Sequence, residues 1–211
     1  MKELSRGVLI AFEGIDGSGK TTQIQKIARF LQEQSYSVTV THEPNHNSKW
    51  GKLIQTKVKK HRETVSPEKE LDWYLKDREW DLSKNILPAL AKKHIVIVDR
   101  YYLSNAAYQG ALDTFSLEDV LQKNSFAREP DLWIILDVPV EIGQARIHQR
   151  DKRNYNDQLE KAEYQEKVRK NYKQLAKMDI SGEILWIDAS GEENELTITL
   201  GSLILEFLDK I

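Results

Sequence analysis

Eight residues near the N-terminus, Gly14-Ile15-Asp16-Gly17-Ser18-Gly19-Lys20-Thr21, combine glycines with one lysine and one terminal hydroxyl. Glycines let backbone N–H groups turn inward around a phosphate, and the N-terminus of a following helix adds partial positive charge. In such a loop the lysine reaches the outer phosphates of a nucleotide, and the threonine hydroxyl binds Mg²⁺. An apolar run at 8–12 and a helical pattern after the loop supply the context that this chemistry requires. The alternative is a chance match in a glycine-rich turn.

An acid followed by an arginine, Asp99-Arg100, comes directly after a second apolar run at 95–98. A carboxylate at that position can hold Mg²⁺, usually through water. A guanidinium forks onto phosphate oxygens, so Arg100 favours a phosphate site. The alternative is that Asp99 only caps the next helix.

Tyr74 and Arg78 are four residues apart, which places them on one face of a predicted helix. An aromatic ring can stack on a nucleotide base while an arginine binds a carbonyl edge of that base. The alternative is an ordinary amphipathic helix with an exposed arginine.

The last candidate feature is a run of basic residues, which consists of Arg146, Arg150, Lys152 and Arg153. Mobile arginines that close over a phosphate chain could neutralise charge in a transition state. The alternative is a solvated helix whose charges pair with nearby acids, here Glu160, Glu163 and Glu166.

The elements that must position these residues follow from apolar periodicity. Five apolar runs predict strands, at 8–12, 37–41, 95–98, 132–136 and, more weakly, 184–187. Helical spacing predicts helices from Lys20 onward, from Ser66 to about Ala91 with a kink at Pro88, over 139–150, over 158–178 and at the C-terminus. Strands that alternate with helices predict a parallel α/β sandwich, whose ligands bind beyond the carboxyl ends of the strands.

Composition limits the remaining possibilities. The 211 residues fit one domain, 1–211, and 40% apolar with 30% charged residues is typical of a globular chain. A net charge of −2 argues against binding a nucleic acid polymer, and the absence of cysteine excludes disulfides and thiolate metal sites. No apolar run approaches the ~20 residues that cross a bilayer, and the N-terminus lacks a signal-peptide pattern, so we expect a cytoplasmic protein without membrane attachment.

In this order the motifs resemble the thymidylate kinase family over nearly the whole chain. The resemblance is carried by the following segments: 12–23 with the glycine loop, Glu43-Pro44, Asp77-Arg78, the stretch from Asp99 to Gly110, Pro130-Asp131-Leu132, Leu136-Asp137-Val138 and Ile187-Asp188-Ala189. The stretch Asp99–Gly110 is the most specific of them, since the glycine loop alone indicates only a nucleotide binder.

The resemblance implies a P-loop NTPase-type three-layer sandwich with a five-stranded parallel sheet and a helical lid. It implies transfer of the γ-phosphate of ATP to dTMP with Mg²⁺, and a homodimer. By motif, ATP is bound by Gly14, Ile15, Asp16, Gly17, Ser18, Gly19, Lys20, Thr21 and Thr22, and the metal by Thr21 and Asp99. Tyr74 falls where a ring stacks on thymine and Arg78 where thymine O4 is bound. Arg100 meets the acceptor phosphate, and Asn105, Tyr108 and Gln109 belong to the substrate-binding set.

Two features set this chain apart from the family pattern. The glycine loop has no arginine, so the lid segment, about 146–160, is expected to supply catalytic charge through Arg150 and Arg153, beside Lys20, Asp16 and Arg100. His42 stands where the family usually places an arginine that contacts the acceptor phosphate, and Gln158 where the lid usually has an Asp-Arg pair. Two alternatives therefore stay open: a related kinase with another deoxynucleotide or deoxynucleoside acceptor, and a non-catalytic nucleotide binder.

Overall fold

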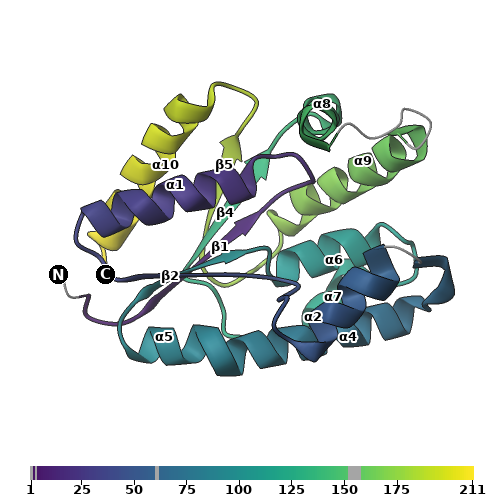
Figure 1. Ribbon diagram of the computed structural model, residues 1–211, viewed down its shortest axis with the longest axis horizontal. Helices are drawn as coiled ribbons and strands as arrows, with labels where there is room; N and C mark the ends of the chain where they lie inside the picture. Colours follow the sequence, from purple (N-terminus) through teal and green to yellow (C-terminus); the bar gives the residue numbers. More distant parts are fainter. Residues whose placement is uncertain (1, 3, 60–61, 152–157) are drawn as a thin grey trace.

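Five parallel strands form the centre of the molecule in the computed structural model, which describes residues 2, 4–59, 62–151 and 158–211 (Figure 1). For residues 150, 151 and 158–161 it describes the backbone alone. The strands are β1 (Val8–Glu13), β2 (Val38–His42), β3 (Ile95–Asp99), β4 (Leu132–Asp137) and β5 (Glu183–Asp188), in the spatial order β2-β3-β1-β4-β5. All five predicted strands are confirmed, and the parallel α/β class with them.

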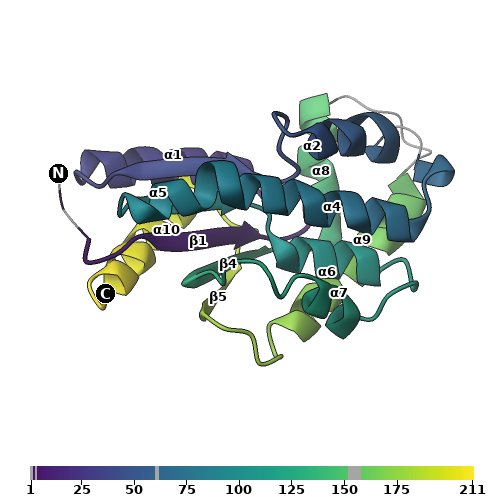
Figure 2. The same ribbon diagram turned by 90° about the horizontal axis from the view of Figure 1, so that it is seen from below.

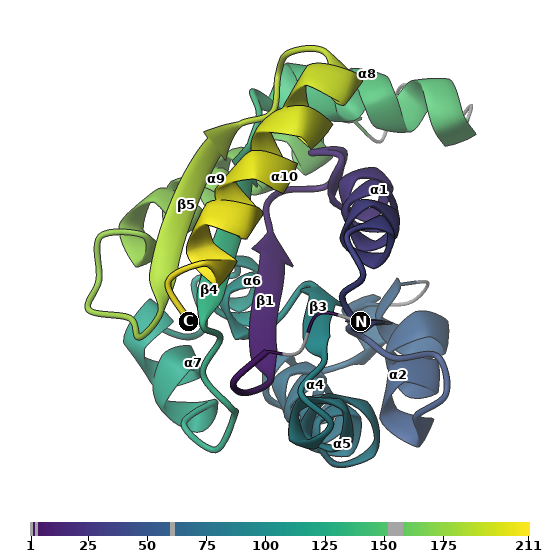
Figure 3. The same ribbon diagram turned by 90° about the vertical axis from the view of Figure 1, so that its left-hand side faces the viewer.

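Helices cover both faces of the sheet. On one face α1 (Lys20–Glu33) packs against α10 (Glu193–Leu208), and the other carries α4 (Pro67–Asp81), α5 (Leu87–Ala91), α6 (Tyr102–Gly110), α7 (Leu117–Lys123) and α9 (Gln158–Leu175) (Figure 3). The helix α8 (Val140–Asp151) follows β4 at the carboxyl edge. The order of these layers confirms the predicted three-layer sandwich. None of the helices in the described ranges is long and apolar enough to cross a membrane.

One long helical run crosses the lower face of the sheet, from Pro67 to Ala91 (Figure 2). Ser66 caps it by accepting from the backbone N–H of Lys69, as predicted. A π-helical turn, η3 (Leu82–Ile86), interrupts it just before Pro88. Proline has no N–H to donate and crowds the preceding turn, and a wider turn relieves both effects. The run thus continues past Pro88 and keeps α4 in place beneath the carboxyl edge.

Burial explains why the three central strands, β1, β3 and β4, could be predicted from the sequence. Every residue of β1 is fully buried, so its sequence is a continuous apolar run that ends at Glu13. The sequence patterns assign no helices to 49–64 or 102–123, where the structure has α2 (Lys49–Leu53), η1 (Ile54–Val58), η2 (Arg62–Thr64), α6 and α7. α6 is buried along nearly its whole length, including polar Ser104, Asn105 and Gln109, so it has no amphipathic stripe.

Candidate functional site at the carboxyl edge of the sheet

The glycine loop joins β1 to α1 and leaves its backbone free to surround an anion. Gly17 has φ +78°, and a Cβ on it would come within 2.1 Å of the Gly143 carbonyl oxygen. Gly19 precedes α1 with φ +93° and no side-chain cap. Strain disfavours a side chain at both points, and lack of space excludes one at Gly17, so the first N–H groups of α1 remain for a ligand. This is the geometry of a phosphate cradle.

Lys20 lies folded back into the loop. Its Nζ donates to the carbonyl oxygens of Gly14 at 3.0 Å and Ile15 at 2.8 Å, and to Ser18 Oγ at 3.2 Å. Burial, with the neighbouring Arg100 charge, lowers the pKa of Lys20 to about 7. A polyphosphate would supply the negative charge that this buried amine lacks.

Two pairs of side chains bridge the loop to the end of β3. Thr21 Oγ1 donates to Asp99 Oδ2 at 2.6 Å, and Arg100 forms an ion pair with Asp16. Although burial opposes the change, Arg100 and Lys20 hold the pKa of Asp16 below its ordinary value. The helix after β3 is capped at Tyr101 without a side-chain bond, so the alternative role of Asp99 as a helix cap is wrong.

Asp16 has a second partner that no sequence pattern indicated. Gln165, from α9, accepts from the Asp16 backbone N–H at 3.3 Å and donates through Nε2 to its carboxylate at 3.1 Å. Gln165 comes 149 positions after Asp16, so only the fold brings the two together. Asp16 is therefore fixed between Arg100 on one side and α9 on the other.

Arg78 is buried on the other side of the site, so the alternative of an exposed arginine is wrong. It is 1% exposed and lies in an ion pair with Glu43, with further bonds to Asn124 and Asn105. Burial raises the pKa of the Glu43 carboxyl, and the Arg78 charge opposes that shift. Among the described residues, Arg78 Nε has no partner although it is buried.

The other predicted acceptor residues on the helices come from α4 and α6. Tyr74 packs one turn earlier on α4, against the small cluster of Ile54, Val58 and Trp73. Asn105 and Gln109 come from α6, and both are buried. The ring of Tyr108 lies under the Arg100 guanidinium, 4.9 Å from its centroid. The structure thus joins α4 and α6 through the contacts of Arg78 with Asn105 and of Gln109 with Glu70, and it places Tyr108 beside Arg100.

His42 ends β2 and lies in register with Asp99 on β3. Its ring packs on His46, with 4.6 Å between the ring centroids. Burial and the neighbouring His46 lower the pKa of His42, while the acids Asp81, Asp99 and Asp77 oppose the shift. Within the part of the chain that the structure describes, its buried Nε2 has no hydrogen-bond partner.

Of the basic run, the structure describes only the first side chain. Arg146 Nη2 donates to the carbonyl oxygen of Ala189 at 2.9 Å, and its Nη1 lies 4.0 Å from where a Cβ on Gly19 would be. Arg146 therefore stands between the glycine loop and the loop after β5. The Arg150 side chain, Lys152 and Arg153 lie outside the described residues, so their predicted roles stay predictions.

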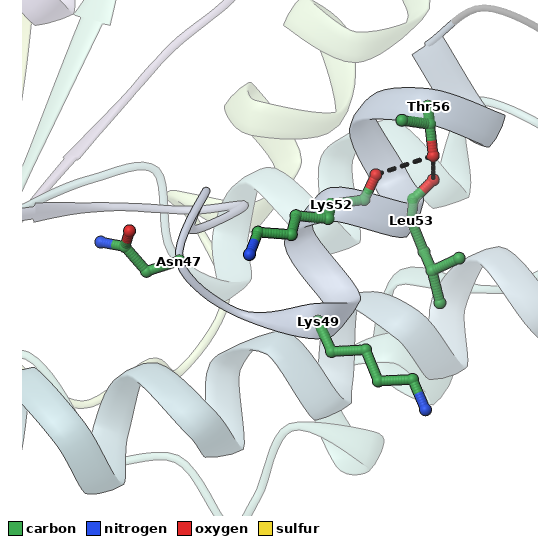
Figure 4. A pocket seen from close by; sticks show the side chains of 5 residues that line it. All are labelled: Asn47, Lys49, Lys52, Leu53 and Thr56. Atoms are coloured by element: carbon green, nitrogen blue, oxygen red, sulfur yellow. Dashed lines mark hydrogen bonds between the residues drawn. The ribbon is translucent and has the colours of Figure 1, made fainter.

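A shallow groove of about 470 Å³ lies beside α2 (Figure 4). Its lining consists of Asn47, Lys49, Lys52, Leu53 and Thr56. Lys52 points toward the loop that carries Asn47, whereas Lys49 points away from it. None of the predicted site residues lines this groove, so it is a separate surface feature.

Comparison with known proteins agrees with this geometry. The family model described as thymidylate kinase matches residues 12–198. A probable thymidylate kinase of Archaeoglobus fulgidus is 43% identical over 204 residues, covering 96% of this chain and 97% of its own. A thymidylate kinase of Desulfotalea psychrophila is 46% identical over 162 residues (77% and 78%), and a probable one of Pyrococcus abyssi 43% over 192 residues (89% and 92%). With this coverage and the site that β1, β3, α4 and α6 assemble, the chain belongs to the thymidylate kinase family.

Proposed function

We propose that this chain transfers the γ-phosphate of ATP to dTMP, which gives dTDP and ADP. The observation that carries the proposal is the position of Arg100 and Asp16. Asp16 belongs to the glycine loop on the donor side, and its ion-pair partner Arg100 lies over the ring of Tyr108, one of the proposed acceptor residues. A phosphoryl group that passes between two nucleotides must cross this point.

On the donor side, the loop Gly14–Gly19 binds the phosphates through backbone N–H groups, with Ile15 and Thr22 as part of the same ATP-binding set. Lys20 neutralises the outer phosphates. Thr21 and Asp99 would hold Mg²⁺, since both offer hard oxygen ligands and their side-chain oxygens lie together, 2.6 Å apart in a hydrogen bond. When bound, Mg²⁺ supplies charge neutralisation between the outer phosphates.

On the acceptor side, Arg100 binds the phosphate of dTMP, and Tyr74 stacks on its base. Arg78 presents an unused buried N–H to thymine O4, which agrees with its lack of a partner at Nε among the described residues. Asn105, Tyr108 and Gln109 enclose the deoxynucleoside. His42, which pairs with Asp99 in the sheet, adds a further contact to the acceptor phosphate in this proposal.

Phosphoryl transfer asks for positioning and charge more than for covalent chemistry by the protein. Lys20 and Arg100 supply two fixed positive charges, and Asp16 keeps Arg100 oriented while Gln165 holds Asp16. Arg150 and Arg153, in the proposed lid at about 146–160, add charge as the transition state forms.

A coupled assay with Mg-ATP and a panel of nucleoside monophosphates and deoxynucleosides tests the function. We expect dTMP to give the highest kcat/KM. Faster turnover of another acceptor, or ATP binding without turnover, would overturn the proposal. We also propose that two copies form a dimer, as the resemblance implies, and light scattering after gel filtration gives the mass that decides this.

A further inference from the structure

One buried carboxylate near the acceptor residues has no part in the mechanism above. Glu70, on the first turn of α4, has a side chain only 3% exposed. Arg62, from the preceding segment η2, donates two parallel hydrogen bonds to this carboxylate. Nε donates to Oε2 at 2.9 Å, and Nη2 donates to Oε1 at 2.8 Å. The two forked N–H groups require acceptors at both oxygens, so Glu70 is held in its ionised, acceptor-only form.

The same carboxylate holds the amide of Gln109. Gln109 Nε2 donates to Glu70 Oε1 at 2.8 Å across the interface between α6 and α4. Because an ionised carboxylate cannot donate, the amide must turn its nitrogen toward Glu70 and its oxygen away. In the described part of the chain, that oxygen, Gln109 Oε1, is buried and accepts no hydrogen bond.

The arginine is anchored from a third element. Arg62 Nη1 donates to the Tyr164 hydroxyl at 3.3 Å, and its guanidinium lies 5.4 Å from the centroid of the Tyr164 ring. Tyr164 in turn donates to the carbonyl oxygen of Tyr108 at 2.9 Å, one residue before Gln109. Arg62 and Glu70 thus form a rigid support behind Gln109, reaching from η2 and α4 to α9.

The contact between Glu70 and Gln109 is one of two side-chain contacts described here between α4 and α6. One face of α4 carries three residues spaced four apart, Glu70, Tyr74 and Arg78. Opposite them on α6, Asn105 bonds Arg78 and Gln109 bonds Glu70, with Tyr74 between the two contacts. Within the described residues, Arg78 Nε and Gln109 Oε1 are buried without a hydrogen-bond partner, as are Glu43 Oε1 and the Tyr108 hydroxyl.

We propose that Glu70, held by Arg62, is a positioning residue that fixes the Gln109 amide and thereby makes the site prefer acceptor bases with an N3–H beside a 4-oxo group. A base of this kind offers a donor to the Gln109 oxygen and an acceptor to the Arg78 N–H. A 4-amino pyrimidine offers the opposite pattern, so it leaves both buried groups unpaired. The inference rests on the proposed function, because it concerns choice among acceptors.

The test compares dTMP with 5-methyl-dCMP, which differ only at N3 and C4. Glu70→Gln replaces the fixed acceptor with an amide that can both donate and accept, so Gln109 is free to turn over. We expect the ratio of kcat/KM for dTMP to that for 5-methyl-dCMP to fall by roughly tenfold, about the worth of one hydrogen bond. In a Gln109→Met background, Glu70→Gln should leave the ratio unchanged, because its effect passes through the amide.

A second variant covers the case in which Glu70→Gln does not fold. Arg62→Leu removes the guanidinium from a side chain that is 36% exposed, and it should lower the ratio in the same direction. A purely structural role predicts lower thermal stability with equal losses for both acceptors. Two results would overturn the inference and leave the proposed function standing. One is an unchanged ratio of the two kcat/KM values in folded variants, and the other is a fall in that ratio on Glu70→Gln that is just as large in the Gln109→Met background. Wild-type protein that does not use dTMP overturns the proposed function, and the inference falls with it.

Discussion

Lys20 in the glycine loop bonds carbonyl oxygens five and six residues earlier, whereas Arg78 on the acceptor side bonds partners 35 and 46 positions away. The part of the donor side that surrounds Lys20 is built from backbone close in sequence, although Thr21 and Asp16 also bond the distant Asp99, Arg100 and Gln165. The acceptor side is built from buried charges that α4, α6, α7 and the loop after β2 bring together. Loss of one donor-side side chain should therefore cost activity alone, while loss of one acceptor-side charge should also cost stability.

The largest effect should come from the donor side. Lys20→Ala removes the charge nearest the transferred phosphoryl group, and we expect kcat/KM to fall by about 10³-fold or more. Burial already disfavours the charged amine in the free protein, so its removal should not lower the free energy of unfolding. Steady-state kinetics and urea unfolding measure the two quantities. Near-normal turnover in the folded variant would remove the glycine loop from the mechanism.

On the acceptor side, stability itself should fall. Arg78→Met leaves Glu43 buried without its cation, and breaking a buried pair in this way costs about 3–5 kcal/mol. The double variant Glu43→Gln, Arg78→Met should recover part of that loss, because it removes the isolated charge.

The matched control is Arg128→Met, since Arg128 pairs with Asp131 while 38% exposed. It should cost less than about 1 kcal/mol in the same urea experiment. Equal losses for Arg78→Met and Arg128→Met would show that the acceptor network does not depend on its buried charge.

This contrast also explains how much was predictable from the sequence. The five strands and the glycine loop were predictable because burial and turn chemistry act on neighbouring residues. The partners of Arg78 and Asp16 were not, since Asn124 and Gln165 reach them from distant helices and carry no pattern of their own. In the sequence, Glu70 looks like an ordinary acid in the first turn of a helix. Only the fold shows that it is buried between Arg62 and Gln109.

A smaller effect should appear as proton uptake on the donor side. With a pKa of about 7, Lys20 is about half protonated at pH 7 in the free protein. The phosphates of ATP favour the charged form, so binding should take up about half a proton at pH 7, more at pH 8 and little at pH 6. Titration calorimetry in buffers of different ionisation enthalpy measures the uptake. Lys20→Arg is the control and should show none of it; the same uptake in that variant would assign the proton to another group.

The smallest effect concerns His42, the acceptor-side histidine. Burial and His46 lower its pKa, so in the free protein it is mostly neutral at pH 7 and gains its proton only on acidification. A dianionic acceptor phosphate raises that pKa, and the phosphate itself loses its second charge below about pH 6. The affinity for dTMP should therefore be highest near pH 6–7 and weaken at higher pH.

His42→Arg keeps the charge at every pH, so it should lower the KM for dTMP by about threefold above pH 7 and flatten the profile on that side, a size typical of a partly exposed ion pair. His46→Asn is the matched control. It removes the neighbouring imidazole, so the weakening should begin at a higher pH than in the wild type. The measurement is the KM for dTMP against pH for the three proteins. Superimposable profiles would mean that His42 only ends β2 and that Arg100 holds the acceptor phosphate without it.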